Sequence, residues 1–184
     1  MPDTEHKGLA PRANPYTYRF IQNWTESRKA AVTKAFDLWN DANARSGLAT
    51  RFAPAEGAEG QDIAVWRQPL GVNSDFDPIL GWFPTPDLPR LQPDGRINGG
   101  SLFLTTDESA LSSDMGYRKM ALHEIGHALG LAHTGRRDGS SVMNRAGRIR
   151  SGNVFEKRDD YLRWMPEDVT ICDQEAAKKR AETQ

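Results

Sequence analysis

The sequence predicts a single domain of the α+β class, and three observations support that prediction. Segments that alternate apolar and polar residues, as strands do, occur beside segments with helical periodicity. Their order is strand, helix, two short strands, a long loop, strand, helix and a final helix, which is an α+β pattern. The 184 residues are 38% hydrophobic and include 5 Trp and 7 Phe, which is enough apolar material for one core.

Four segments have the composition of strands. They are 16–21, 48–52, 62–66 and 101–105. Residues 67–99 are rich in Pro, Gly, Asn and Asp and are much longer than an ordinary connection, so we expect a long, ordered surface loop there.

Three segments have the periodicity of helices. The first begins after Thr25 or Ser27 and runs to about Ala44, where Gly47 stops it, and its buried face is Val32, Ala35, Phe36 and Trp39. The second is expected at 115–129, with a buried stripe of Leu122, Ile125 and Leu129. The third is expected to open at Pro166, with an inner face of Val169, Cys172 and Ala176.

Composition and charge exclude several classes of protein. A formal net charge of −1 gives no support to binding nucleic acid by broad phosphate neutralisation. No apolar run approaches the roughly 20 residues of a membrane span. The single cysteine, Cys172, excludes a disulfide framework and a cysteine-based zinc ribbon, and it is expected to be a small core residue. The first 15 residues lack the apolar stretch of a signal peptide, so an intracellular protein and a trimmed one both stay open.

The strongest chemical signal is at residues 123–133, which read His-Glu-Ile-Gly-His-Ala-Leu-Gly-Leu-Ala-His. His123 and His127 are four residues apart on a predicted helix, so both imidazoles lie on one face and can reach one metal ion. Glu124 follows the first histidine, where its carboxylate can approach a water molecule held by that ion.

The residues after this helix strengthen the signal. Gly130 can adopt a left-handed conformation, so the chain can double back and His133 can supply a third nitrogen. Three protein ligands with an open fourth position are typical of catalytic zinc. A bare His-Glu-x-x-His would arise by chance in about 2% of such chains, whereas the extended pattern would arise in roughly 5 in 100,000. The competing interpretation is a helix with incidental surface histidines.

This motif, followed by a methionine-containing turn, resembles that of the metzincin zinc endopeptidases. Ser141-Val142-Met143-Asn144 lies where that turn is expected, and the resemblance implies that Met143 forms an apolar floor beneath the metal. Thr134 after the third histidine resembles the matrixins, the matrix-metalloproteinase-like group. The resemblance covers roughly 16–175.

The resemblance implies a zincin fold of two lobes. A twisted mixed β-sheet with two helices would form the upper lobe, residues 16–130, and a small irregular lobe with one helix, residues 131–176, would lie across an active-site cleft. Together they would make one catalytic domain, 16–176. Residues 1–15 are expected to be a flexible arm, and residues 177–184 a charged, frayed tail.

The sequence also departs from the matrixin pattern. Only His6 remains outside the motif, so the second, structural zinc of matrixins is not expected. Trp82, Phe83 and Phe103 stand where its histidines would be, and we expect their packing to replace that metal.

Two other features of matrixins, calcium binding and a latency motif, have little or no support in this sequence. Four acidic residues could include calcium ligands, although solvated turns are the favoured interpretation: Asp75, Asp77, Asp107 and Glu108. The cysteine-containing latency motif is absent.

The predicted function is that of a zinc-dependent endopeptidase, in which His123, His127 and His133 hold one zinc ion and Glu124 acts first as base and then as acid. The substrate is a polypeptide, aligned by strand 101–104 as the family's edge strand. The resemblance implies a monomeric, secreted protein.

Two alternatives stay open: a catalytically silent zinc-binding module that recognises peptides, and a zinc hydrolase acting on something other than polypeptide. Arg145 or Arg148 could favour an acidic or polar residue just past the scissile bond, although complementary solvated faces of one molecule are the favoured interpretation of the local charges.

Overall fold

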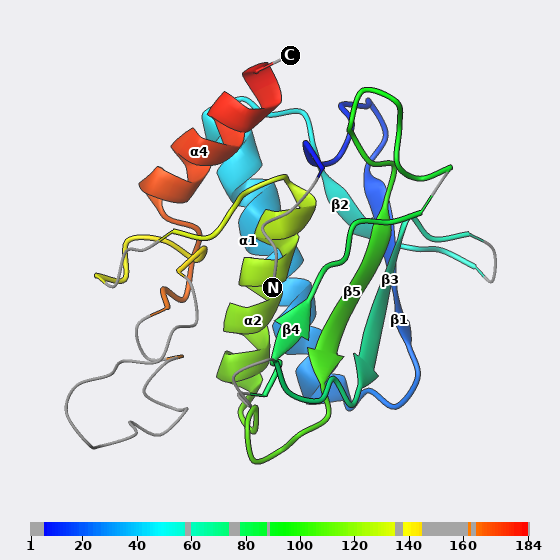
Figure 1. Cartoon of the computed structure of the whole chain (residues 1–184), viewed down its shortest axis with the longest axis vertical. Coiled ribbons are helices and arrows are strands. Elements are labelled where there is room, and N and C mark those ends of the chain that lie inside the picture. The colour runs from blue at the N-terminus through cyan, green and yellow to red at the C-terminus, as the bar shows by residue number, and fades with distance from the viewer. Residues whose placement is uncertain are drawn as a thin grey trace.

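The fold is a five-stranded mixed sheet with helices packed on one face (Figure 1). The computed structural model describes residues 6–57, 60–73, 78–87, 89–134, 138–144, 162 and 165–183. The strands are β1 (Tyr16–Ile21), β2 (Phe52–Pro54), β3 (Ile63–Gln68), β4 (Gly81–Trp82) and β5 (Gly100–Thr105), and the helices are α1 (Glu26–Ser46), α2 (Asp114–Ala128) and α4 (Ile171–Glu182). The predicted α+β class is therefore confirmed. Within these residues, no helix has both the length and the apolar character needed to cross a membrane.

The strand order β2-β1-β3-β5-β4 decides which strand is free at each edge. Strands β2, β1, β3 and β5 are parallel neighbours, and β4 pairs antiparallel with β5. Because β5 has a partner on both sides, the prediction that residues 101–104 form the edge strand is wrong. The edge strand beside α2 is β4, which the composition of residues 67–99 had suggested was loop. Two residues are too few to show an alternating pattern, so only pairing with β5 defines this strand.

Helix α1 confirms the predicted face and both predicted ends. Thr25 is its N-cap, and Gly47 ends it with a φ of 80°. The buried indole of Trp39 donates from Nε1 to the carbonyl oxygen of Leu122 at 2.9 Å, which locks α1 onto α2. The strand expected at 48–52 begins later, at Phe52, because Leu48 donates its backbone N–H to Asn43 and completes the helix cap.

The third predicted helix was placed too early and ended too soon. Helix α4 begins only at Ile171, because Thr170 and Asp173 form a reciprocal capping box. It continues to Glu182, so the predicted frayed tail is helical. Its buried positions are Asp173 and Ala177, whereas Cys172 is only half-buried and Ala176 is exposed. The predicted inner face was therefore wrong by one residue at both of these positions.

The predicted flexible arm is packed against the domain from His6 onward. His6 and Leu9 are buried. Leu9 donates its backbone N–H to Ala128 at 2.9 Å, and the next residue, Ala10, donates to Ile97 at 2.9 Å. The prediction of flexibility is therefore wrong for residues 6–10.

The outer face of the sheet carries a row of aromatic rings. Phe103 on β5 lies between Trp66 on β3, at 6.3 Å between ring centroids, and Trp82 on β4, at 5.9 Å. This row agrees with the expected packing of Trp82 on Phe103. Phe83 does not join it, because Phe83 is buried and a Cβ on Gly100, which faces the helices, would lie 2.7 Å from its ring.

Candidate metal centre

Helix α2 presents the first two histidines to one point in space. Ser113 caps the helix and Asp114 lies in its first turn, so the termini favour this helix locally. His123 Nδ1 lies 2.7 Å from the carbonyl oxygen of Val142, and His127 Nδ1 lies 2.8 Å from that of Leu131. A carbonyl oxygen can only accept, so each Nδ1 carries the proton and each Nε2 keeps a lone pair. This is the tautomer that metal-binding histidines use.

The third histidine comes from the chain reversal after α2. Gly130 has a φ of 83°, and Leu131 donates its N–H back to Gly126 at 3.0 Å. The reversal brings His133 Nε2 to 3.1 Å from His123 Nε2 and 3.2 Å from His127 Nε2. The one candidate group of metal ligands among the described residues is this trio, whose ligand atoms all lie within 4.8 Å of one another.

These distances fit a tetrahedral divalent cation. Zinc–nitrogen bonds of about 2.05 Å at tetrahedral angles put two ligand nitrogens about 3.3 Å apart. Without a cation, the lone pairs on the Nε2 atoms of His123 and His127 would crowd the Nε2 of His133. His123 is buried, and this burial, together with the neighbouring His127 and His133, holds its pKa well below the usual value. Neutral, deprotonated imidazoles are the form that zinc requires.

Glu124 is the buried acid beside this centre. Burial raises the pKa of its carboxyl to about 8, and the backbone N–H of Phe83 partly opposes that rise. Strand β4 passes directly over the carboxyl, because a Cβ on Gly81 would lie 2.6 Å from Glu124 Oε1. Only glycine therefore leaves this carboxyl undisturbed. A divalent cation nearby would favour the ionised form and pull the pKa down.

The predicted methionine turn packs against the same helix. Met143 is buried, and a Cβ on Gly126 would overlap its sulfur. Gly126 lies between the two histidines of α2 in the sequence. The turn also holds the first histidine, because the acceptor for His123 is the carbonyl of Val142.

Sequence reasoning missed the residue that anchors this turn. Asp173 on α4 is 1% exposed. It accepts from Ser141 Oγ at 2.6 Å, the Val142 N–H at 3.1 Å, and Thr170 through its N–H at 3.0 Å and its Oγ1 at 2.8 Å. The spacing Thr170-x-x-Asp173 signals a helix cap in the sequence, but its reach to the methionine turn does not show there.

The comparisons with known proteins agree with this geometry. The matrixin family model matches residues 10–163. The chain belongs to the matrixin family. Human neutrophil collagenase is 30% identical over 135 residues, which are 72% of this chain but only 26% of the collagenase. The archaemetzincin of Methanopyrus kandleri, at 10% identity, superposes with a TM-score of 0.54 over 95% of this chain and 96% of its own, which is a likeness of fold alone.

Among the described residues, the two other acidic candidates, Asp107 and Glu108, are engaged by protein partners. Glu108 is held by the guanidinium groups of Arg28 and Arg67 at 2.5 Å each, and Asp107 accepts from the N–H and hydroxyl of Ser109. Calcium therefore has no support among the described residues. Four further candidates lie outside the described residues: Asp75, Asp77, Arg145 and Arg148.

Proposed function

We propose that this matrixin is a zinc-dependent endopeptidase. The observation that carries the proposal is the convergence of three imidazole Nε2 atoms, with the buried carboxyl of Glu124 on the residue that follows His123 on α2. His123, His127 and His133 would hold the ion, and Met143 would form the apolar floor beneath it. When bound, zinc polarises a peptide carbonyl and acidifies a water molecule.

Glu124 carries the proton in this proposal. A general base must be ionised at the working pH. Burial alone raises the pKa of this carboxyl to about 8, and a cation bound at the histidines would lower it again and favour the ionised form. Glu124 would take a proton from the water molecule whose oxygen bonds to the peptide carbonyl carbon, and would then deliver it to the amine nitrogen as the C–N bond breaks. The Phe83 N–H and the close approach of Gly81 hold the carboxyl in one place during both transfers.

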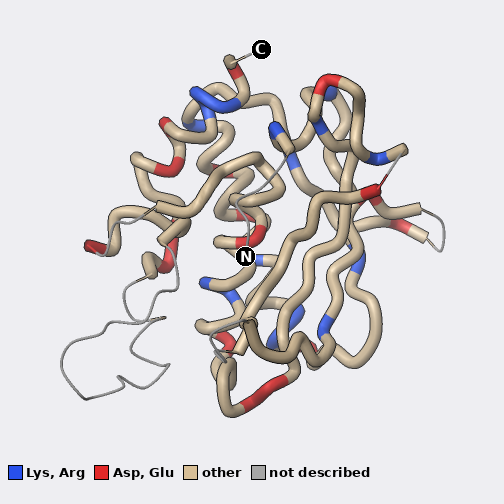
Figure 2. The backbone as a smooth tube through the Cα atoms, in the orientation of Figure 1, with Lys and Arg blue, Asp and Glu red and all other residues tan. Residues whose placement is uncertain are grey.

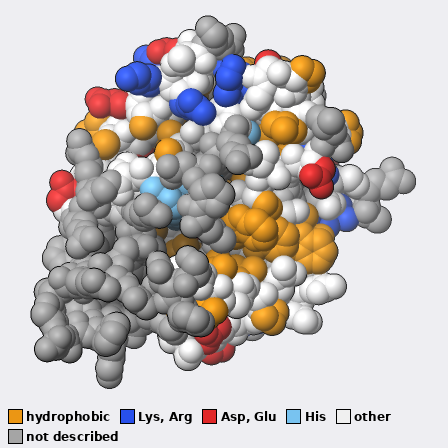
Figure 3. Space-filling model, viewed as in Figure 1, with side chains coloured by type: hydrophobic (Ala, Val, Ile, Leu, Met, Phe, Trp, Pro, Cys, Tyr) orange, Lys and Arg blue, Asp and Glu red, His pale blue; other side chains and the backbone are white. Residues whose placement is uncertain are grey.

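Strand β4 is suited to align an extended substrate. It pairs with β5 on one side only, and no other described strand pairs with it. A peptide can therefore add to the sheet through backbone hydrogen bonds, which tolerate many side chains. Figure 3 shows histidine side chains at the surface beside a patch of hydrophobic side chains on this face. We therefore propose polypeptide substrates of broad sequence. Membership of the matrixin family supports the separate proposal that cleavage takes place outside the cell.

Digestion of casein by the purified protein, with and without a chelator, tests the proposal. We expect chelator-sensitive cleavage, one zinc ion per chain, and nearly complete loss of turnover in Glu124→Ala with the zinc retained. Exposed Glu175 supplies a control, and Glu175→Ala should cleave normally. Peptide binding without cleavage by the wild type would favour the silent module instead, and cleavage of only non-peptide esters or amides would favour another hydrolase.

A further inference from the structure

The N-terminal arm, residues His6–Ala10, crosses the chain reversal that delivers the third histidine. The crossing is made by two glycines, Gly8 with a φ of 94° and Gly130 with a φ of 83°. A Cβ on Gly8 would lie 2.5 Å from the backbone of Leu129, and a Cβ on Gly130 would lie 2.6 Å from the carbonyl oxygen of Lys7. The two backbones are therefore in direct contact, with no room for a side chain on either.

The arm is also hydrogen-bonded to this reversal. Leu9 donates its N–H to Ala128, the residue after His127, at 2.9 Å. The same reversal supplies the Leu131 carbonyl that orients His127 at 2.8 Å. Residues 128–131 are thus held by the arm on one side and by the imidazole of His127 on the other.

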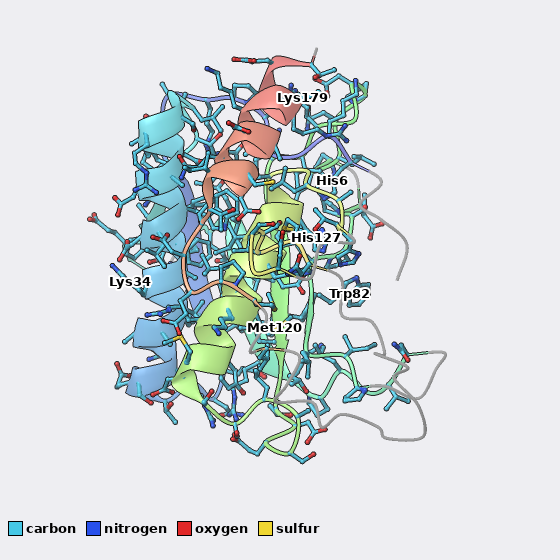
Figure 4. All side chains as sticks on the ribbon, turned by 90° about the vertical axis from the view of Figure 1, so that its left-hand side faces the viewer. His6, Lys34, Trp82, Met120, His127 and Lys179 are labelled. Atoms are coloured by element: carbon cyan, nitrogen blue, oxygen red, sulfur yellow. The ribbon has the colours of Figure 1, made fainter. Side chains whose placement is uncertain are left out.

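The arm has its own anchors outside the metal centre. His6 is buried, and its Nδ1 accepts from the Gly8 N–H at 3.0 Å, which fixes the bend before the crossing. Arg180 on α4 donates to the His6 carbonyl at 3.2 Å, and Lys7 donates its N–H to Gly95 at 2.7 Å. Figure 2 marks the positions of Lys and Arg residues on the last turns of α4, and Figure 4 shows His6 and His127 near each other at the end of α2.

We infer that the arm is a regulatory part of the metal centre: it holds the 128–131 reversal, and thereby His133, in the position that binds metal. Displacing the arm should weaken metal binding while the sheet and the α1–α2 pair persist, because only Leu9 of the arm belongs to the main apolar core. Any process that removes or displaces residues 6–10 would then switch the site off. This inference rests on the proposed function only in taking zinc as the metal.

Gly8→Ala tests the inference, with Gly47→Ala as its matched control. Both glycines have positive φ, so both variants carry backbone strain of the same kind, but a Cβ on Gly47 meets nothing within 4 Å. Zinc affinity is measured by competition with a chromophoric chelator well below the melting temperature, and the visible spectrum of the Co²⁺-loaded protein reports ligand geometry. We expect Gly8→Ala to bind zinc at least tenfold more weakly with altered Co²⁺ bands, and Gly47→Ala to stay within twofold of wild type.

A second variant keeps the test decisive if Gly8→Ala does not fold. His6→Ala removes the acceptor of the Gly8 N–H without adding an atom, and we expect a smaller loss of zinc affinity in the same direction. Wild-type zinc affinity in the folded arm variants would overturn the inference and leave the proposed function intact. Failure of the wild type itself to bind zinc would instead overturn the proposed function.

Discussion

Replacing Asp173 should damage both stability and metal binding, although Asp173 is not one of the three candidate metal ligands. Its carboxylate accepts from Ser141, Val142 and Thr170 inside the protein. Asp173→Ala removes the acceptor of the buried Val142 N–H and of the part-buried Thr170 N–H, at about 1–3 kcal/mol for the buried group and less for the other. The hydroxyl groups of Ser141 and Thr170 also lose their acceptor, so we expect the free energy of unfolding to fall by about 4 kcal/mol in total. For a chain of this size that corresponds to a melting temperature roughly 8–16 °C lower.

The same change should reach the metal. Val142 receives the Asp173 contact on its N–H and orients His123 through its carbonyl oxygen, so a loosened turn loosens the first histidine. Loss of such an orienting partner typically weakens metal affinity by roughly 10–100-fold. Asp173→Asn preserves shape but turns an NH₂ group toward the donors, and we expect about half of the stability loss.

Urea denaturation and zinc competition measure both effects, and Glu175→Ala is the control because Glu175 is exposed on the same helix. The reasoning would be refuted by an Asp173→Ala protein that unfolds within about 1 kcal/mol of the control and binds zinc equally well.

Two further predictions concern pH and the aromatic row. In the metal-free protein, burial raises the pKa of folded Glu124 to about 8, whereas the unfolded group loses its proton near 4.5. The contribution of this group to folding is therefore full only below pH 4.5, falls steadily above it, and its last part is lost as pH rises from 7 through 8. Urea denaturation should show wild type losing about 1 kcal/mol more than Glu124→Gln between pH 7 and 9, and equal losses would contradict the assignment. Phe103→Ala removes two aromatic contacts and should lower the free energy of unfolding by about 2 kcal/mol. The melting temperature should then fall by roughly 4–8 °C. An unchanged melting temperature would show that the aromatic row does not stabilise the sheet.

Much of the fold could be predicted because local signals agree with the tertiary structure. Helix α1 has a clean apolar face between Thr25 and Gly47, and both ends lie where those residues place them. The trio of histidines was predictable because helix geometry puts residues four apart on one face and a glycine permits the reversal. Where two local signals competed, as at Pro166 and the Thr170 capping box, the prediction chose wrongly.

The sequence by itself determined the chemistry of the site: which nitrogens meet, which carboxyl stands beside them, and which family the pattern belongs to. Only the tertiary structure decided what surrounds that chemistry. Strand β4 exists because β5 offers it a partner, Asp173 supports the methionine turn from 31 residues away in the chain, and the arm from His6 packs against the reversal at Gly130. The physical reason is that these contacts join segments remote in sequence, and no local pattern records which backbone will lie against which.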